Sequence, residues 1–433
     1  MAGLLVHPNV RGPEITAAEV RREGEAWRQT SWADLSRTVV DPGRYEVRAQ
    51  ATGAATDDAV EVPTCAGRTG VRVDGKAVAT TSPGPMVAPL APGPHEVVIA
   101  VTVGGYERRI ACGGPLRVGP VENTVEGLGT FAFDSPYASR GGGQAVVYVP
   151  PGRDVRKLAT LLVGLHPWNG GIWTYAAYEE LLREASARGV LLLMPSGLGN
   201  SLYTADAEDE VLRAIDALGA ITGHADSHAR AWNVSLWGAS MGGAGATTIG
   251  FHHPDRFATV TSLFGDSRYD LSTYVRAILR DEHAAHVLNA LDVADNARNL
   301  PVWLIHGEQD RTSPIRQSEM LADALRQRGF TVRFDRAPGM GHAGALVARY
   351  LPELVAVAAG ATTVTEPARV TYWSVRPSDL GAYGVRIERA SATGDAFVDV
   401  ERRADGYHVL RQVGVRAVSF DPVVPAPAQP TAP

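Results

Sequence analysis

The sequence lacks any apolar run that approaches the roughly 20 residues needed to cross a bilayer, so we expect no membrane-spanning segment. Its 41 basic and 47 acidic residues give a net charge of −6, which provides no basic surface for nucleic acid and no polybasic membrane anchor. It also lacks an H-E-x-x-H motif and a cysteine–histidine cluster, so we predict no metal or other cofactor. These absences exclude nucleic acid and membranes as expected partners and favour a globular protein.

Cysteine is scarce, since the 433 residues include only Cys65 and Cys112. Both fall in one predicted β domain, and two interpretations stay open: a disulfide, which would favour export, or two buried thiols. The first residues form a short apolar patch with no basic segment before it, so no signal peptide is predicted in this sequence. The compartment and the oligomeric state are left open.

Changes in composition and in the pattern of apolar residues divide the chain into five segments. Residues 14–36 are charged and compatible with a helix, with Trp27 and Trp32 as expected packing anchors. Short alternating runs separated by glycine- and proline-rich turns then indicate antiparallel strands. The predicted segments are a helical segment at 1–36, a small antiparallel β domain at 37–125, an α/β domain at 126–361, a small β domain at 362–421 and a disordered Pro/Ala-rich tail at 422–433.

The long central segment alternates apolar strand runs with helix-compatible stretches. The runs at 159–165, 190–194 and 234–237 are continuously apolar or nearly so, as expected for strands buried on both faces. Alternation of this kind predicts a doubly wound, mostly parallel sheet with helices on both faces. Functional groups should then gather at the carboxyl ends of its strands.

One of these strand ends carries the pattern G-x-S-x-G, from Gly238 through Ser240 to Gly242. A serine at a sharp strand-to-helix turn takes a strained backbone conformation, and its neighbours must be nearly free of side chains so that adjacent backbones can approach. The turn exposes the hydroxyl beside a helix N-terminus, whose N–H groups favour negative charge. Ser240 is therefore the candidate nucleophile.

A serine hydroxyl needs a base, and the base needs an acid to orient it. Asp310 follows the apolar strand at 302–306, and His342 lies in a glycine-rich loop after another strand. The order Ser240, Asp310, His342 is the one that this architecture requires. Asp266 is a weaker candidate for the acid, and His306 is expected to be structural.

Two backbone N–H groups are expected to stabilise an oxyanion. Met241 follows the nucleophile and supplies one. The turn after the strand at 159–165 should supply the other, but Pro167 has no N–H, so Trp168 is the best candidate. The segment at 269–299, rich in charge and helix formers, is either a cap over the site or an ordinary pair of surface helices.

These motifs resemble the α/β-hydrolase superfamily over roughly residues 140–360. The resemblance rests on LLVGLHPWNGG, WGASMGGAGATT followed by HHPDRFA, NLPVWLIHGEQDRTSP and APGMGHAG. Within the superfamily the chain is similar to bacterial esterases of the polyhydroxybutyrate-depolymerase and feruloyl-esterase type and to prolyl-oligopeptidase-like hydrolases. The resemblance implies a triad of Ser240, Asp310 and His342 with Trp168 and Met241 as oxyanion donors. Pro167 departs from the glycine that usually follows the histidine of such a turn.

The sequence thus predicts a serine esterase that cleaves carboxylic esters, small or polymeric, through an acyl-enzyme. A prolyl-oligopeptidase-like peptidase is the alternative, although it would usually need an acidic anchor for a substrate amine. Only Glu308 and Asp266 lie near enough in the sequence to be considered for that role. A second alternative is a non-catalytic binding protein on the same fold.

Overall fold

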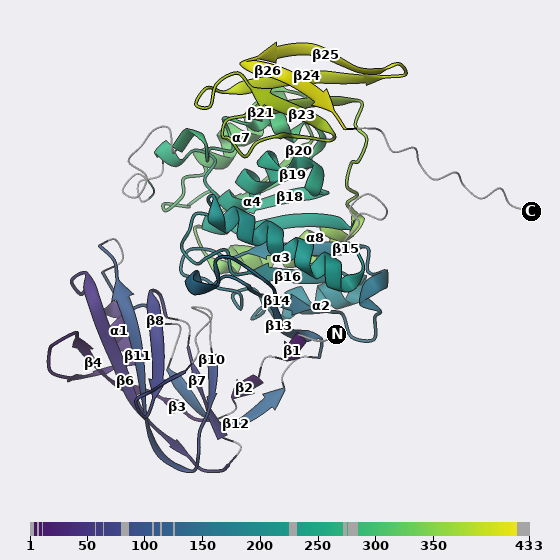
Figure 1. Ribbon diagram of the computed structural model, residues 1–433. Coiled ribbons are helices and arrows are strands. Elements are labelled where there is room, and N and C mark those ends of the chain that lie inside the picture. Colours follow the sequence, from purple (N-terminus) through teal and green to yellow (C-terminus); the bar gives the residue numbers. More distant parts are fainter. Residues whose placement is uncertain are drawn as a thin grey trace, which may run out of the picture.

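The structure is a computed structural model that describes residues 4–6, 8–10, 12–56, 58–63, 65–78, 86–105, 108–112, 115–123, 126–224, 232–271, 275 and 285–421. The tail predicted to be disordered at 422–433 lies outside this range, as does part of the candidate cap at 269–299. Figure 1 shows an α/β domain in the middle, with one β domain at each end. None of the described helices is both long and apolar enough to span a membrane.

The central domain is built on a mostly parallel sheet. Strands β15 to β20 pair in parallel, and β13 and β14 add an antiparallel edge on which β1 also pairs. In spatial order the strands are β1 (Leu4–Val6), β13 (Leu128–Ala132), β14 (Gln144–Tyr148), β16 (Leu191–Pro195), β15 (Thr160–Leu165), β17 (Asn233–Ala239), β18 (Thr259–Leu263), β19 (Val302–Gly307) and β20 (Val332–Ala337).

Helices cover both faces of this sheet, as the alternating sequence predicted. Helices α3, α4 and α7 bury residues in the hydrophobic core on one face, and α2 and α8 bury theirs in the core on the other. The domain is therefore doubly wound. Its helical elements are η1 (Ala138–Arg140), η2 (Val155–Lys157), α2 (Glu179–Arg188), α3 (Asp206–Thr222), α4 (Met241–His252), η3 (Pro254–Arg256), η4 (Tyr269–Leu271), η5 (Ala294–Asn299), α7 (Arg316–Gln327) and α8 (Gly344–Gly360).

The helical segment predicted at 1–36 is wrong, because most of its described residues form strands. In β4 (Ala17–Arg22), Ala18 and Val20 alternate inward, and the intervening charges pair across strands rather than along a helix. Glu19 accepts a hydrogen bond from Arg48, and Arg21 donates to Glu46. The charge spacing suits a helix as well as a sheet, and only the partner strand decides between them. The N-terminal β domain consequently begins near residue 8, and α1 (Trp32–Arg37) is its one described helix.

Two antiparallel sheets enclose the core of this N-terminal domain, which includes Trp32 and Cys65. One sheet has the order β5-β4-β6-β11-β8-β9 and the other β10-β7-β12-β2, with β3 beside β12. The remaining bounds are β2 (Pro8–Val10), β3 (Glu14–Ile15), β5 (Arg28–Ser31), β6 (Gly43–Gly53), β7 (Asp58–Val62), β8 (Arg68–Val73), β9 (Lys76–Val78), β10 (Met86–Pro89), β11 (Gly93–Val103) and β12 (Leu116–Asn123).

Cys65 and Cys112 form a disulfide in the core of this domain, with a sequence separation of 47. We expect the double variant Cys65→Ser/Cys112→Ser to lower the free energy of unfolding of this domain by about 4 kcal/mol, because the open chain regains the entropy of a loop of that length. Urea unfolding followed by tryptophan fluorescence checks this. Equal unfolding midpoints for the variant and the oxidised wild type would contradict it.

The C-terminal β domain consists of two three-stranded antiparallel sheets, β21-β24-β25 and β22-β23-β26. Its own core gathers Tyr372, Val385, Val398 and other apolar side chains. The strands are β21 (Arg369–Ser374), β22 (Gly381–Ala382), β23 (Val385–Arg389), β24 (Ala396–Arg403), β25 (Gly406–Val413) and β26 (Val415–Phe420).

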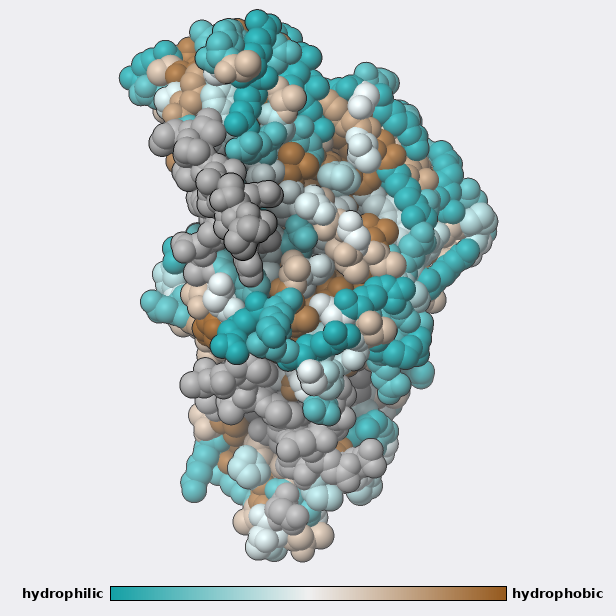
Figure 2. All heavy atoms as spheres, turned by 90° about the vertical axis from the view of Figure 1, so that its right-hand side faces the viewer, coloured by the Kyte–Doolittle hydropathy of each residue, from teal (hydrophilic) through white to brown (hydrophobic). Residues whose placement is uncertain are grey.

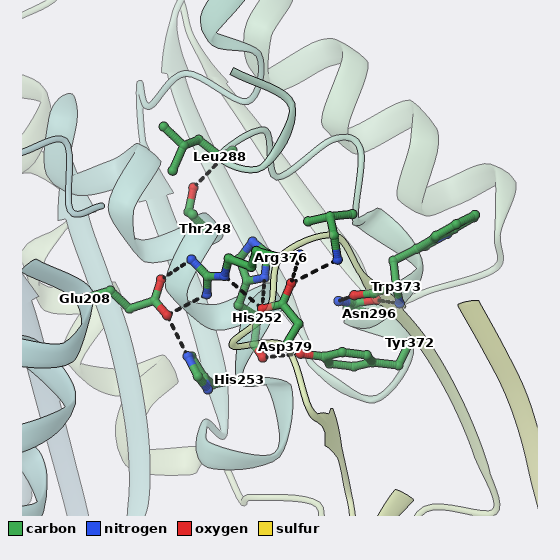
Figure 3. A network of polar contacts seen from close by, with 11 residues as sticks. Glu208, Thr248, His252, His253, Leu288, Asn296, Tyr372, Trp373, Arg376 and Asp379 are labelled. Atoms are coloured by element: carbon green, nitrogen blue, oxygen red, sulfur yellow. Dashed lines mark hydrogen bonds and ion pairs between the residues drawn. The ribbon is translucent and has the colours of Figure 1, made fainter. Parts of the chain in front are cut away.

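A buried charged network joins this C-terminal domain to the central domain (Figure 3). Arg376 donates two hydrogen bonds to Glu208 on α3, at 2.9 and 2.5 Å, and a third to Asp379 at 2.8 Å. His253 and His252, at the end of α4, contact Glu208 and Asp379 at 2.7 and 2.9 Å respectively. The two domains therefore share one set of charges.

Acid should weaken this junction. Burial raises the pKa values of Glu208 and Asp379, but the adjacent histidines and Arg376 outweigh it and lower both to about 2. Because unfolded Asp and Glu titrate near pH 4, both carboxylates stabilise the fold above about pH 4.5 and lose that contribution as the pH falls toward 2. The midpoint of urea unfolding should fall between pH 5 and pH 3, and this fall should be larger for the wild type than for Glu208→Gln. An equal fall for both proteins would contradict this expectation.

On the face seen in Figure 2, hydrophilic side chains cover most of the described surface, and hydrophobic residues lie between them in small groups. The large apolar side chains are concentrated in the cores of the three domains.

Candidate active site

The G-x-S-x-G sequence forms the expected sharp turn between β17 and α4. Ser240 has φ +57° and ψ −120°, a conformation that non-glycine residues rarely adopt. A Cβ on Gly242 would lie 1.8 Å from the carbonyl oxygen of Leu165, and one on Gly238 would lie 2.4 Å from the backbone of Gly242. Both glycines are therefore required by close backbone contact, which is the steric reason that the sequence pattern suggested.

Three side chains far apart in the sequence meet at this turn. His342 Nε2 lies 2.8 Å from Ser240 Oγ, and His342 Nδ1 lies 2.7 Å from Asp310 Oδ2. Each comes from the carboxyl edge of the sheet: Ser240 follows β17, Asp310 follows β19, and His342 follows β20. A hydroxyl, an imidazole and a carboxylate hydrogen-bonded in this order have the geometry of a Ser-His-Asp triad.

Asp310 is held ionised and fixed in orientation. Its Oδ1 accepts hydrogen bonds from the backbone N–H groups of Thr312 and Ser313 at 2.8 and 2.9 Å. Burial raises the pKa of Asp310, but contacts with His306 and His342 outweigh it and hold the pKa well below its usual range. Asp310 is thus a charged acceptor for His342 at neutral pH.

The other acidic and histidine candidates have different partners. Asp266 accepts a hydrogen bond from Ser313 Oγ at 2.5 Å, so it supports the loop that holds Asp310. His306 is fully buried and lies 2.8 Å from both Ser318 Oγ and the carbonyl oxygen of Ser313, and 3.5 Å from Asp310. It therefore braces Asp310, a role that the sequence did not predict because it depends on loops folding back over a strand end.

The two candidate oxyanion donors flank Ser240. Met241 opens α4, where a backbone N–H has no partner within the helix. Trp168 lines the same pocket as Ser240. Its turn is fixed to the loop after β16, because Asn169 N–H donates to Asn200 at 2.7 Å and Asn200 donates back to Asn169 at 2.7 Å. The donor roles of Trp168 and Met241 stay a prediction.

The pocket at Ser240 has a volume of about 340 Å³. Its walls are mainly aromatic or small, and they include Trp168, Tyr175, Tyr178 and Phe264. The Phe264 ring contacts His342 edge-on at 4.6 Å between centroids. Of the described residues that line the pocket, none is an aspartate, glutamate, lysine or arginine. The site therefore suits an uncharged group near the serine.

The candidate cap at 269–299 is described only in part. Its described residues Tyr269, Val275, Leu288 and Val293 are buried in the core on the α4 face of the sheet. The described residues that line the pocket come from other segments. Within the described ranges, no three His, Cys, Asp or Glu side chains lie close enough together to hold a metal ion.

Residues 207–357 match the prolyl oligopeptidase family. The central domain has the α/β-hydrolase fold. No curated protein matches the chain. Many solved structures match, among them the S-formylglutathione hydrolase from Agrobacterium tumefaciens, with 19% identity, a TM-score of 0.45, and coverage of 55% of this chain and 96% of that one.

Two further solved structures have similar scores. MPT51 (FbpC1) from Mycobacterium tuberculosis is 18% identical, with a TM-score of 0.44, over 55% of this chain and 99% of that one. The acylaminoacyl peptidase from Pyrococcus horikoshii is 15% identical, with a TM-score of 0.43, over 56% of this chain and 44% of that one. The family match at 207–357 covers the part of the central domain that runs from α3 to α8.

Proposed function

We propose that this hydrolase cleaves carboxylic esters through a Ser-His-Asp triad and an acyl-enzyme intermediate. The observation that supports this most is the continuous hydrogen-bond line from Ser240 through His342 to Asp310, with distances of 2.8 and 2.7 Å. His342 takes the proton of Ser240 Oγ as the oxygen attacks the ester carbonyl. Asp310 holds the imidazole in the required tautomer and stabilises its protonated form.

The oxyanion that forms accepts hydrogen bonds from the N–H groups of Met241 and Trp168, at the positive end of α4. His342 then gives its proton to the leaving alcohol. Water attacks the acyl-enzyme by the same steps in reverse, and Ser240 is regenerated. The pocket volume of about 340 Å³ is at the small end for ligand sites, which favours a short acyl group.

A peptidase is the second candidate, favoured by the family match over residues 207–357. A peptidase that recognises a free amino terminus needs a carboxylate near the site. Glu308 is exposed, and Asp266 is buried against Ser313; neither lines the pocket in the described part of the chain. This favours the ester over a peptide with a charged amino terminus. A binding role without catalysis is less favoured, because Ser240, His342 and Asp310 lie within hydrogen-bond distance of one another in the order that catalysis needs.

The test is hydrolysis of p-nitrophenyl esters from acetate to octanoate, with a prolyl p-nitroanilide peptide in parallel. We expect turnover of the esters, fastest for the short acyl chains, and little turnover of the anilide. Faster turnover of the anilide would favour the peptidase instead. No turnover of either would overturn the proposal for these substrates and favour the binding role.

A further inference from the structure

The two turns that form the site follow neighbouring strands. Strands β15 and β17 pair in parallel from Thr160 opposite Asn233 to Leu165 opposite Gly238. Beyond these ends, β15 leads into the turn that carries Trp168, and β17 leads into the turn that carries Ser240. In this register, the N–H of Ala239 faces the carbonyl oxygen of Leu165 at the end of the ladder.

A tyrosine hydroxyl bonds to both of these backbone groups. Tyr175 Oη donates to the carbonyl oxygen of Leu165 at 2.8 Å and accepts from the N–H of Ala239 at 2.9 Å. The hydroxyl therefore ties the two strand ends together where the two turns begin.

The ring that carries this hydroxyl is held in place. Tyr175 is fully buried, and its ring packs on Trp237 with 4.1 Å between centroids. A Cβ on Gly164 would lie 2.9 Å from Tyr175 Cδ2, so this glycine leaves the space that the ring occupies. Burial raises the pKa of the phenol far above neutrality. The hydroxyl therefore stays protonated and can donate and accept at once.

We propose that Tyr175 is a positioning residue that sets the separation between the oxyanion turn and the nucleophile turn. The proposal rests on the proposed ester hydrolysis and deepens it. Tyr175 acts through the backbone of Leu165 and Ala239, each one residue before a turn, and it need not touch the reacting atoms. Without the hydroxyl, the link that it makes between these two groups is lost, and it no longer fixes the two turns relative to each other.

The test compares Tyr175→Phe with Tyr372→Phe. Tyr372 is the matched control because it is equally buried and its hydroxyl also donates to a backbone carbonyl, that of His252 at 2.7 Å, away from the pocket. For Tyr175→Phe we expect kcat for p-nitrophenyl acetate to fall on the order of 10²-fold, as for a small misplacement of reacting groups, with KM nearly unchanged. Tyr372→Phe should keep the wild-type kcat per folded molecule.

Inhibition by butylboronic acid separates positioning from simple loss of folded enzyme. The tetrahedral boronate on Ser240 mimics the charged intermediate, so its inhibition constant should rise in parallel with the fall in kcat. A merely structural role would lower the active fraction and leave that constant unchanged. An unchanged constant, or a kcat loss no greater than that of Tyr372→Phe, would overturn the proposal.

Two additional arms keep the proposal testable. If Tyr175→Phe does not fold, p-aminophenylalanine at position 175 restores a donor to Leu165, and it should retain more than half of the wild-type affinity for the boronate.

If the wild type hydrolyses no ester, the proposed function fails by itself, and amide hydrogen exchange at Ala239 tests the bridge instead. Exchange there should be at least tenfold faster in Tyr175→Phe than in Tyr372→Phe, and equal exchange would overturn the bridge.

Discussion

Replacing Ser240 by alanine should lower kcat for p-nitrophenyl acetate on the order of 10⁶-fold, to the background rate. The variant removes the only atom that bonds to the acyl group, and the remaining His342 and Asp310 pair has nothing to activate. Removing the nucleophile of a triad costs about as much as removing the whole triad, because the three residues act as a unit. Steady-state kinetics with purified wild type and variant give the result.

A serine on the strand that precedes Ser240 provides the control. Ser235 lies on β17, is fully buried, and its Oγ has no hydrogen-bond partner among the described residues. Ser235→Ala therefore removes an unsatisfied polar atom and should keep both the fold and the activity. If Ser240→Ala kept more than a hundredth of the wild-type kcat while Ser235→Ala behaved as expected, Ser240 would not be the nucleophile.

The triad residues could be predicted from the sequence because each is tied to a strand end by local chemistry. The turn at Ser240 requires glycine at positions 238 and 242. Five consecutive residues are therefore enough to predict the turn from the sequence. Asp310 and His342 follow strand runs that are recognisable by their apolar composition. The topology then brings these carboxyl ends to one edge, where the three side chains meet. Their catalytic roles remain predictions.

The groups that support the triad could not be predicted in the same way. Tyr175 bridges two strands through a single hydroxyl, and its only sequence signal is an aromatic-rich stretch after the oxyanion turn. His306 was expected to be structural, but its contact with Asp310 depends on how the following loop folds back. Such contacts arise from packing between segments that are distant in the sequence, and no local sequence pattern predicts them.

The N-terminal strands show the opposite failure, in which a local pattern was present but ambiguous. Charges at 19 and 21 fit a helix surface, yet Arg48 and Glu46 on β6 pair with them across a sheet. The guanidinium groups of Arg21 and Arg48 each lie over the ring of Trp27, at 4.4 and 4.3 Å from its centroid. Tertiary partners therefore decided the structure over helix compatibility.

Arg376→Met should lower the free energy of unfolding by about 3–5 kcal/mol, the usual effect of removing one partner from a buried ion pair. The side chains of Arg376, Glu208 and Asp379 are 12, 7 and 0% exposed, so water cannot replace the lost guanidinium. The variant leaves two buried carboxylates without their guanidinium partner, and each keeps only its contact with a histidine. The midpoint of urea unfolding at pH 7 measures the loss.

An exposed arginine of the same domain separates burial from charge. Arg386 pairs with Asp421 at 2.8 Å, but the two side chains are 52 and 47% exposed. Arg386→Met removes the same charge and should cost no more than about 1 kcal/mol, since exposed ion pairs contribute little. Equal losses for the two variants would mean that the network in Figure 3 is not what holds the C-terminal domain to α3 and α4. A large loss for Arg376→Met alone would mean that the domain junction depends on burying these charges together, and that the nucleophile helix is anchored at its far end by a domain outside the α/β-hydrolase fold.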